Sequence, residues 1–450
     1  MTKITNLTLL ATLDGIKNQQ FSEEELNVAY LNRINQYNPT LNAYLGTCIN
    51  SAGIPVAIKD IISTKGIRTT AGSRILENYI PPYDATVIEK LYDEGCNIMG
   101  KVNCDEFALG SSGENSAYSV AKNPWDITKV PGGSSSGSAV AVAADLCVFA
   151  LGTDTGGSIR QPASLCGVVG FKPSYGRVSR YGAIAMSSSL DQIGPFTKTV
   201  SDAKKVMEWI SGPDGFDSNC ILNDLYKANP ELKDLKGVKV GVPTEYFEEG
   251  LDKGVEKVIK EAIQKLEDLG AEIIEISLPN TKYAVAVYYI IMASELSSNL
   301  ARFDGIRFGE DRSKFGAEAK RRIMLGTFSL SSGYYDAYFT KAAKVRNLII
   351  QDFKRAFERV DVIVGPVSPT VAWNIGEKIN DPLKMYLSDA YTIPASLAGL
   401  PGLSVPCGFS EGLPVGLQIL GKHGEDSRVL DIGEAYENAC EWKEEKPSLD

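Results

Sequence analysis

The chain carries a glycine- and serine-rich run, Pro131-Gly132-Gly133-Ser134-Ser135-Ser136-Gly137-Ser138, and a second one, Gly152-Thr153-Asp154-Thr155-Gly156-Gly157-Ser158. Between them, residues 139–151 begin with small apolar side chains and end in a short apolar run. A closely packed helix followed by a buried strand fits this pattern. The sequence therefore predicts turn, helix, strand and turn, with serines on both turns.

Both predicted turns leave backbone N–H groups unpaired, one by entering a helix and the other by leaving a strand. Such groups hold phosphates or stabilise oxyanions. The glycines are followed by no Gly-Lys-Ser/Thr and form no Gly-x-Gly-x-x-Gly, which disfavours nucleotide binding. A flexible Gly/Ser linker is the other alternative, but the apolar helix and strand directly after the first turn argue against it. The serines instead favour hydroxyl chemistry.

Composition excludes several classes of protein. The 450 residues are 44% hydrophobic, enough to bury a large core. With 46 basic and 56 acidic residues the net charge is −10, which disfavours a surface that binds nucleic acid or anionic lipid on its own. We expect any polyanion to be held by a partner.

The eight cysteines are scattered without a CxxC pair, a pattern typical of reduced core thiols in a cytosol and not of a disulfide framework or zinc site. We expect no metal. The N-terminus lacks the apolar core of a signal peptide, and no apolar run reaches the ~20 residues that a membrane-spanning helix needs. The sequence therefore predicts a cytoplasmic protein without a membrane span.

A histidine-based catalytic triad is disfavoured because the chain has one histidine, His423, in a polar loop. If a serine is the nucleophile, the sequence favours a lysine as its base. The candidate is Lys59, which interrupts the apolar run 53–62. A lysine there must be paired, reach solvent from the strand end, or stay neutral because burial lowers its pKa.

Strand-like and helix-like segments alternate along the chain. Ser22 and Glu25 form a capping-box pattern at the start of a helix. Residues 239–243, 255–269 and 273–276 have the patterns of a strand, a helix and a strand. We predict an α/β fold: a single large domain with a mixed, mainly parallel central sheet covered by helices on both faces. Its sections are an N-terminal helical region at about 1–50, a catalytic core at about 51–280, a helical segment at about 282–358 and a return to the sheet at about 360–450.

Lys59, Ser134 and Ser158 together suggest acyl transfer on an amide or ester. A serine hydroxyl needs a base to take its proton, and a neutral lysine can serve through a second, relaying serine. Backbone N–H groups of the turn Thr155-Gly156-Gly157 could hold the tetrahedral oxyanion, where each donor contributes ~3 kcal/mol.

Three motifs in this order resemble the amidase signature family, and the resemblance covers nearly the whole chain. They are residues 55–60, 132–138 and 152–160. The resemblance implies that Ser158 is the acyl-forming nucleophile, that Ser134 is a relay serine after a cis peptide bond, and that Lys59 is the terminal base.

Three positions depart from the pattern of the family. Ser136 replaces the usual second glycine of the Gly-Gly-Ser-Ser-Gly-Gly-Ser run. Gly113 stands where a threonine is common, and Cys104 stands where a methionine is common. These departures bear on the first serine turn and the rim of the pocket more than on the predicted triad.

Residues 297–305, 320–327 and 385–389 resemble the tRNA-dependent amidotransferase branch of the family. By that resemblance, Arg322 binds the α-carboxylate of glutamine and Asp389 its α-ammonium. The charges of the two side chains agree with this assignment. A free amino acid presents one anion and one cation, and arginine binds a carboxylate with two hydrogen bonds. Ordinary surface charges are the alternative interpretation. Tyr289, or its neighbour Tyr288, is a candidate for lining the pocket.

The resemblance also implies partners and a reaction. Glutamine is hydrolysed through the Ser-Ser-Lys triad, and ammonia passes to a separate B subunit that activates Glu-tRNA(Gln), or Asp-tRNA(Asn), with ATP and Mg²⁺. A small C subunit bridges the two, and the tRNA contacts mainly the B subunit. No cofactor is expected in this chain. Two alternatives remain: a stand-alone amidase acting on another small amide, and a catalytically silent scaffold subunit.

Overall fold

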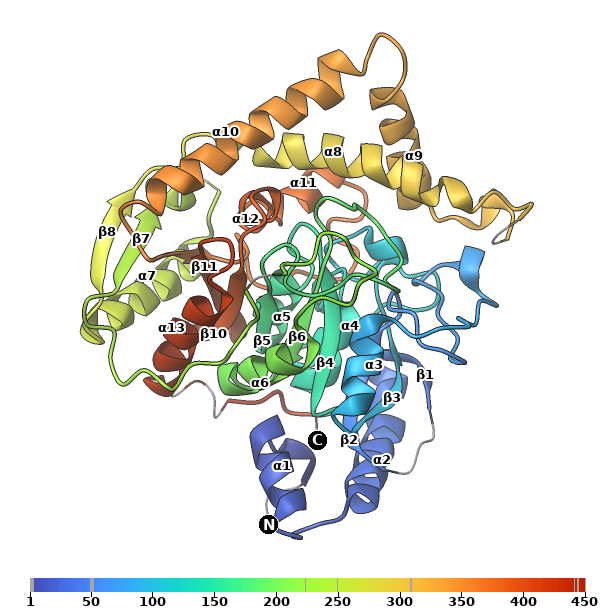
Figure 1. Ribbon diagram of the computed structural model, residues 1–450, viewed down its shortest axis with the longest axis vertical. Helices are drawn as coiled ribbons and strands as arrows, with labels where there is room; N and C mark the ends of the chain where they lie inside the picture. Colours follow the sequence, from blue (N-terminus) through green and yellow to red (C-terminus); the bar gives the residue numbers. More distant parts are fainter. Residues whose placement is uncertain are drawn as a thin grey trace.

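Eleven strands form one continuous sheet in the computed structural model, which describes residues 4–48, 52–222, 224–248, 250–307, 310–440, 442 and 445–449 (Figure 1). The strand order is β1-β3-β2-β4-β6-β5-β10-β11-β9-β7-β8. The strands are β1 Tyr44–Thr47, β2 Ile54–Lys59, β3 Cys96–Val102, β4 Phe149–Asp154, β5 Val169–Lys172, β6 Gln192–Thr197, β7 Lys239–Pro243, β8 Glu272–Ile276, β9 Val362–Pro366, β10 Gly402–Ser410 and β11 Leu413–Gly421. The section boundary predicted near residue 50 lies outside the described residues.

The predicted mixed sheet is confirmed, but the prediction that it is mainly parallel is wrong. Parallel pairing joins β2 to β3 and β4, and β7 to β8 and β9. The other pairings are antiparallel. Strand–helix–strand patterns predict only the parallel blocks, because a helix returns the chain to the same end of the sheet. The centre is different because β10 and β11 form a hairpin with a short turn, and β6 runs against both of its neighbours.

Two sets of helices flank the sheet. Helices α4 and α5 contact each other and the sheet, whereas α6 contacts α3 and α13. The helices are α1 Leu9–Lys17, α2 Glu23–Leu41, α3 Thr86–Asp93, α4 Ser136–Ala143, α5 Arg160–Cys166, α6 Val200–Ile210, α7 Lys253–Asp268, α8 Ala284–Asn299, α9 Ala317–Ser329, α10 Lys341–Ala356, α11 Pro382–Leu387, α12 Ile393–Leu397 and α13 Asp426–Asn438.

Local sequence signals determine several of these boundaries. At the start of α2, Ser22 Oγ accepts the Glu25 N–H at 3.1 Å, and the Glu25 carboxylate accepts the Ser22 N–H at 2.8 Å. This is the predicted capping box. The helix predicted over 255–269 corresponds to α7, whose N-cap is Asp252.

Helices α8, α9 and α10 form a cap across one end of the sheet (Figure 1). They occupy most of the segment predicted to be helical at about 282–358. The helical stretch Thr281–Arg302 is the one described segment long and apolar enough to cross a membrane by length and composition, and half of its apolar window is buried within the molecule. That burial is typical of a core helix, since α8 packs against α9, α10 and α12.

Candidate active site

The site lies at the ends of two neighbouring strands. Strands β2 and β4 are parallel partners, so their carboxyl ends meet at the same edge of the sheet. Strand β2 ends at Lys59, and β4 ends at Asp154, just before the turn that carries Ser158. Ser134 lies two residues before α4, which packs on both strands. The topology therefore brings the three motifs together.

Lys59 is fully buried and does not reach solvent from the strand end. Its Nζ donates to Ser134 Oγ at 2.8 Å and to Thr153 Oγ1 at 2.7 Å. Burial lowers the pKa of Lys59 from 10.5 to about 8, against the opposing effect of Cys104 and nearby carboxylates. A useful fraction of Lys59 is therefore neutral near pH 8, as a general base requires.

The two serine turns are bound to each other. The Gly133–Ser134 peptide bond is cis, and the Gly133 N–H donates to the side chain of Gln161 at 3.0 Å. Ser135 crosses to the second turn, where its N–H donates to Ser158 O at 3.3 Å and its Oγ to Thr153 O at 3.1 Å. These contacts hold the candidate relay serine against the candidate nucleophile's turn.

The second turn is held at its far end by a buried ion pair. Arg160 binds the Asp154 carboxylate through two nitrogens, each at 3.0 Å, and that carboxylate also accepts the Ile159 N–H at 3.1 Å. Asp154 and Arg160 are both fully buried. Residues 155–158 are thus closed into a loop whose two ends meet at one carboxylate.

The middle of the turn is held by Thr392, which precedes α12. Its hydroxyl donates to Gly156 O at 2.6 Å. In a trans peptide the C=O and N–H groups point in opposite directions, so this contact turns the Gly157 N–H away from Thr392. Among the described residues, the N–H groups of Thr155, Gly156 and Gly157 have no hydrogen-bond acceptor. They are available to an oxyanion beside Ser158, which is 9% exposed.

Arg322 lies on α9 with 4% of its surface exposed, so it is not an ordinary surface charge. Its guanidinium lies against a pair of aromatic rings, 4.6 Å from the centroid of Tyr289 and 4.8 Å from that of Tyr386. The two rings stack with centroids 3.9 Å apart. Glu318 accepts from Arg322 Nε at 2.6 Å and from the Tyr386 hydroxyl at 3.1 Å. The Glu318 carboxylate and the two rings together fix the direction of the guanidinium.

Asp389 is also buried, and its carboxylate accepts the Ser111 hydroxyl. Burial raises its pKa to about 7, against the opposing effects of Ser111 and Arg322. Thr392 Oγ1 lies 3.1 Å from Asp389 O as well as contacting the catalytic turn. Asp389 therefore lies beside the nucleophile's turn and within the field of the Arg322 charge.

Other residues that shape this site were named from the sequence without a definite role or were missed. Tyr288, weighed beside Tyr289, lies closer to the catalytic turn, since a Cβ added at Gly156 would be 2.8 Å from its hydroxyl. Thr153 was present in the second quoted run but without an assigned contact. Thr392 gave no sequence signal, because its contact with Gly156 joins segments far apart in the chain. Glu318 lies four residues before Arg322 on α9, and this i, i+4 spacing of an acid and a base is the signal that could have identified it.

Two of the departures from the family pattern lie against each other. Gly113 has φ +83°, and a Cβ added there would be 2.7 Å from Ser136 Cβ. Glycine at 113 therefore leaves the space that the Ser136 side chain fills. Cys104 is buried near Lys59, and its thiol stays protonated because burial raises its pKa.

A histidine base and a metal centre were the two other chemistries to consider at the site. His423 is exposed, with its Nε2 3.0 Å from Tyr175 O, so it cannot serve as the base of Ser158. Among the described residues, no group of three His, Cys, Asp or Glu side chains is placed to hold a metal ion. All eight cysteines are free thiols.

A buried lysine bonded to one serine, beside a turn that carries a second serine, is the arrangement that a serine hydrolase with lysine in place of histidine requires. Residues 25–430 match the family model described as Amidase, and the chain belongs to this family. The predicted family is thereby confirmed.

The similarity to curated proteins covers nearly the whole chain. It is 53% identical to the A subunit of the glutamyl-tRNA(Gln) amidotransferase of Thermoanaerobacter pseudethanolicus, over 97% of each chain. It is 50% identical to the protein of that name from Chloroflexus aurantiacus, over the full length of both. The crystal structure of the corresponding glutamyl-tRNA(Gln) amidotransferase protein from Thermotoga maritima superposes with a TM-score of 0.87 at 47% identity, covering 97% of this chain and 96% of that one.

Proposed function

We propose that this chain hydrolyses the side-chain amide of glutamine and supplies the ammonia to partner subunits that convert Glu-tRNA(Gln) to Gln-tRNA(Gln). One observation carries the proposal: a cation, Arg322, and an anion, Asp389, are both buried, and Asp389 lies within the field of Arg322 and beside the turn that carries Ser158. A neutral alkyl or aryl amide needs neither charge, whereas the α-carboxylate and α-ammonium of glutamine need both. The full-length similarity to the amidotransferase proteins supports it.

The geometry suggests the following sequence of steps. Neutral Lys59 takes a proton from Ser134 as Ser134 takes one from Ser158, and Ser158 Oγ attacks the amide carbon. The N–H groups of Thr155, Gly156 and Gly157 hold the oxyanion. On collapse the C–N bond breaks, and the proton returns from Lys59 through Ser134 to the departing ammonia. Water then attacks the acyl-enzyme by the same relay, which frees glutamate and Ser158.

Substrate recognition follows from the two buried charges. Arg322, oriented by Glu318, binds the α-carboxylate, and Asp389 binds the α-ammonium. Tyr289 lines the pocket beside Arg322. Because Thr392 contacts both Asp389 and Gly156, the substrate's ammonium is held at a fixed distance from the oxyanion turn. Binding thereby places the amide for attack.

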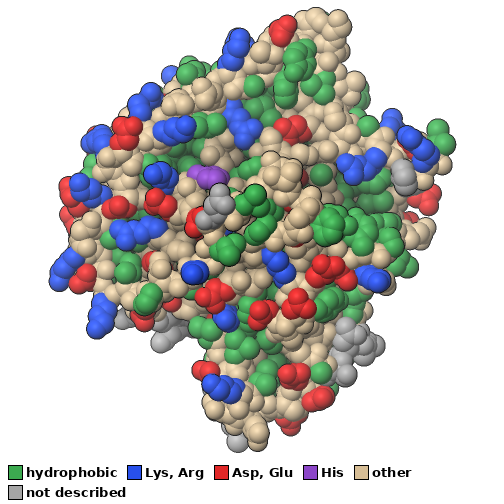
Figure 2. Space-filling view, in the orientation of Figure 1, with side chains coloured by type: hydrophobic (Ala, Val, Ile, Leu, Met, Phe, Trp, Pro, Cys, Tyr) green, Lys and Arg blue, Asp and Glu red, His purple; other side chains and the backbone are tan. Residues whose placement is uncertain are grey.

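The chain acts within a complex of several subunits. The B subunit binds ATP and Mg²⁺ and activates the aminoacyl-tRNA, and the C subunit bridges the two. On the face shown in Figure 2, basic and acidic side chains are interspersed, which fits a chain that leaves the tRNA to its partner. We place the reaction in the cytoplasm, away from membranes. Asp-tRNA(Asn) is the second substrate to test.

The decisive experiment measures ammonia release from glutamine by the tagged chain, purified with its co-purifying proteins, beside the same preparation carrying Ser158→Ala. Release that disappears in the variant supports the proposal. If neither preparation releases ammonia from glutamine and only the unmutated chain cleaves simple amides, the protein is a stand-alone amidase. Failure of a fluorophosphonate probe to label Ser158 would instead indicate a silent scaffold.

A further inference from the structure

Asp191 is a carboxylate beside the catalytic turn to which the mechanism above gives no role. It directly precedes β6, the antiparallel partner of β4. In that register Asp154 lies opposite Gln192, so the next pair along the ladder is Thr155 and Asp191. The strand pairing thus brings Asp191 to the first residue of the oxyanion turn.

Three donors from two segments hold the Asp191 carboxylate. The Thr155 hydroxyl donates to Oδ1 at 2.7 Å. The Met186 N–H donates to Oδ2 at 2.9 Å, and the Ser187 N–H lies 3.0 and 3.1 Å from the two oxygens. A carboxylate accepting several N–H and O–H bonds is firmly oriented. Asp191 therefore fixes Thr155 relative to the loop at 186–187.

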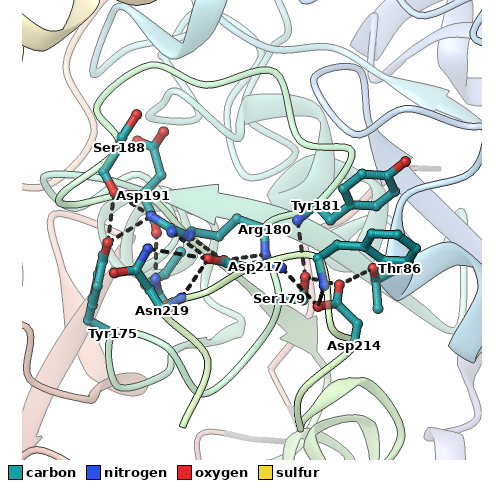
Figure 3. A network of polar contacts seen from close by, with 12 residues as sticks. Thr86, Tyr175, Ser179, Arg180, Tyr181, Ser188, Asp191, Asp214, Asp217 and Asn219 are labelled. Carbon is teal, nitrogen blue, oxygen red and sulfur yellow. Dashed lines mark hydrogen bonds and ion pairs between the residues drawn. The ribbon is translucent and has the colours of Figure 1, made fainter.

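That loop is anchored to the rest of the molecule. Ser187 Oγ donates to Glu295 of α8 at 2.6 Å, and the Ser189 N–H donates to the same carboxylate at 3.0 Å. Figure 3 shows Asp191 beside Arg180, whose guanidinium binds both oxygens of Asp217 at 2.7 and 2.8 Å. Asp191 is therefore a rigid support and not the end of a loose loop.

The turn needs such support because its next two residues are glycines. Glycine restricts the backbone least, and Gly157 has φ +143°. The far end of the turn is held through Asp154 and its middle through Thr392. The start of the turn is held through the side chain of Thr155, whose hydroxyl donates a hydrogen bond to Asp191.

We propose that Asp191 is a positioning residue for catalysis: by accepting the Thr155 hydroxyl, it fixes the backbone N–H groups of the turn that stabilise the oxyanion. It acts through Thr155 and leaves the binding of the α-carboxylate and α-ammonium to Arg322 and Asp389. The inference rests on the proposed function in one respect, namely that glutamine is the natural substrate at Ser158. Its geometry applies to any acyl group or phosphonate at Ser158.

The first test is Asp191→Asn in the intact complex. The variant conserves volume, but its amide cannot accept from Thr155 while satisfying both loop N–H groups. We expect kcat for glutamine to fall about 10- to 100-fold with KM changed less than about 2-fold, because displaced oxyanion donors act on the transition state. Assays near pH 8 keep Asp191 ionised in the parent, since burial raises its pKa only to about 6. A raised KM with unchanged kcat would overturn the proposal.

A double-mutant cycle separates positioning from general loosening. Thr155→Val removes the hydroxyl and should reproduce the loss alone, which also keeps the test valid if Asp191→Asn folds poorly. Adding Asp191→Asn to Thr155→Val should then cost less than about 2-fold, whereas adding it to Thr155→Ser should cost its full factor. Equal losses in all backgrounds would show that Asp191 does not act through Thr155.

The matched control is Asp217→Asn, which removes a carboxylate from the network drawn in Figure 3, whereas the Thr155 hydroxyl donates to Asp191. Any loss it causes should add to that of Thr155→Val instead of vanishing. A second readout, the rate at which a fluorophosphonate labels Ser158, should fall by the same factor as kcat in Asp191→Asn. A parent that labels Ser158 but releases no ammonia from glutamine would refute the proposed substrate and still test Asp191.

Discussion

At the scale of single residues, the proposed catalysis depends on a lysine that must lose its proton. Burial brings the pKa of Lys59 to about 8 and raises that of Asp389 to about 7. In the proposed mechanism the two groups need opposite charge states: Lys59 acts when uncharged, whereas Asp389 binds an ammonium when charged. Both reach the active state as pH rises, so the acid side of the pH profile reports on both.

Fluorophosphonate labelling of Ser158 needs neutral Lys59 but no α-ammonium site. We therefore expect its rate to rise tenfold per pH unit and to level off above about pH 8. For glutamine, kcat/KM should follow the same rise above about pH 7 and fall more steeply below it, where Asp389 also becomes protonated. Stopped assays from about pH 6 to about pH 9 distinguish the two curves.

Asp389→Asn serves as the control because it should leave the labelling curve in place while lowering kcat/KM for glutamine. A labelling rate that does not change across this range would mean that Lys59 is not the base of Ser158.

At the scale of elements, the two serine turns and the loop that carries Gly113 are packed as one unit. The family commonly has threonine and glycine where this chain has Gly113 and Ser136. Since a Cβ at 113 would lie 2.7 Å from Ser136 Cβ, the two departures are coupled: one position gives up the volume that the other takes.

Gly113→Thr should lower the free energy of unfolding by about 2 kcal/mol or more, from overlap with Ser136 and from positive φ. Adding Ser136→Gly should recover about 1 kcal/mol, although Ser136→Gly alone destabilises the start of α4. Urea unfolding monitored by circular dichroism measures all three variants.

Gly66→Thr is the matched control, since Gly66 has φ +74° and no atom within 4 Å of an added Cβ. It measures backbone strain without overlap. If Ser136→Gly lowers stability equally in the parent and in Gly113→Thr, the two positions are not coupled.

The sequence predicted elements where its patterns were uninterrupted. The helix at α7 and the strands β7 and β8 followed their hydrophobic periodicity. Strand β6 contains Gly194 and Pro195, and β10 contains Pro406 and Gly408, so their apolar patterns are broken. These central strands are antiparallel, which is why the predicted mainly parallel sheet was wrong.

Motif spacing predicted Lys59, Ser134 and Ser158 together because each lies in a distinctive local run. Asp191 and Thr392 could not be predicted in this way, because their contacts depend on strand register and on the packing of distant loops. A pattern along the chain reports on its own segment and on the face it presents, whereas positioning contacts appear only after the sheet has formed.

At the scale of the whole molecule, the proposed substrate site draws on both the sheet and the cap formed by α8, α9 and α10. The triad and the oxyanion turn belong to the sheet, while Arg322 belongs to α9, which packs on α8 and not on the sheet edge. Under the proposed function, glutamine bound at both places would join the cap to the sheet. The cap would then contribute specificity, and the sheet the chemistry.

Arg322→Gln tests this division. Without the guanidinium the α-carboxylate loses a charged, doubly hydrogen-bonded partner, so we expect kcat/KM for glutamine to fall at least about 100-fold, mostly through KM. Labelling of Ser158 should stay within about 2-fold of the parent because the sheet is untouched. The control is Arg321→Gln on the same helix. Arg321 also pairs with Glu318, but its side chain is 45% exposed, so its loss should leave both rates unchanged. Equal losses of labelling and glutamine hydrolysis in Arg322→Gln would show that the cap supports the triad itself.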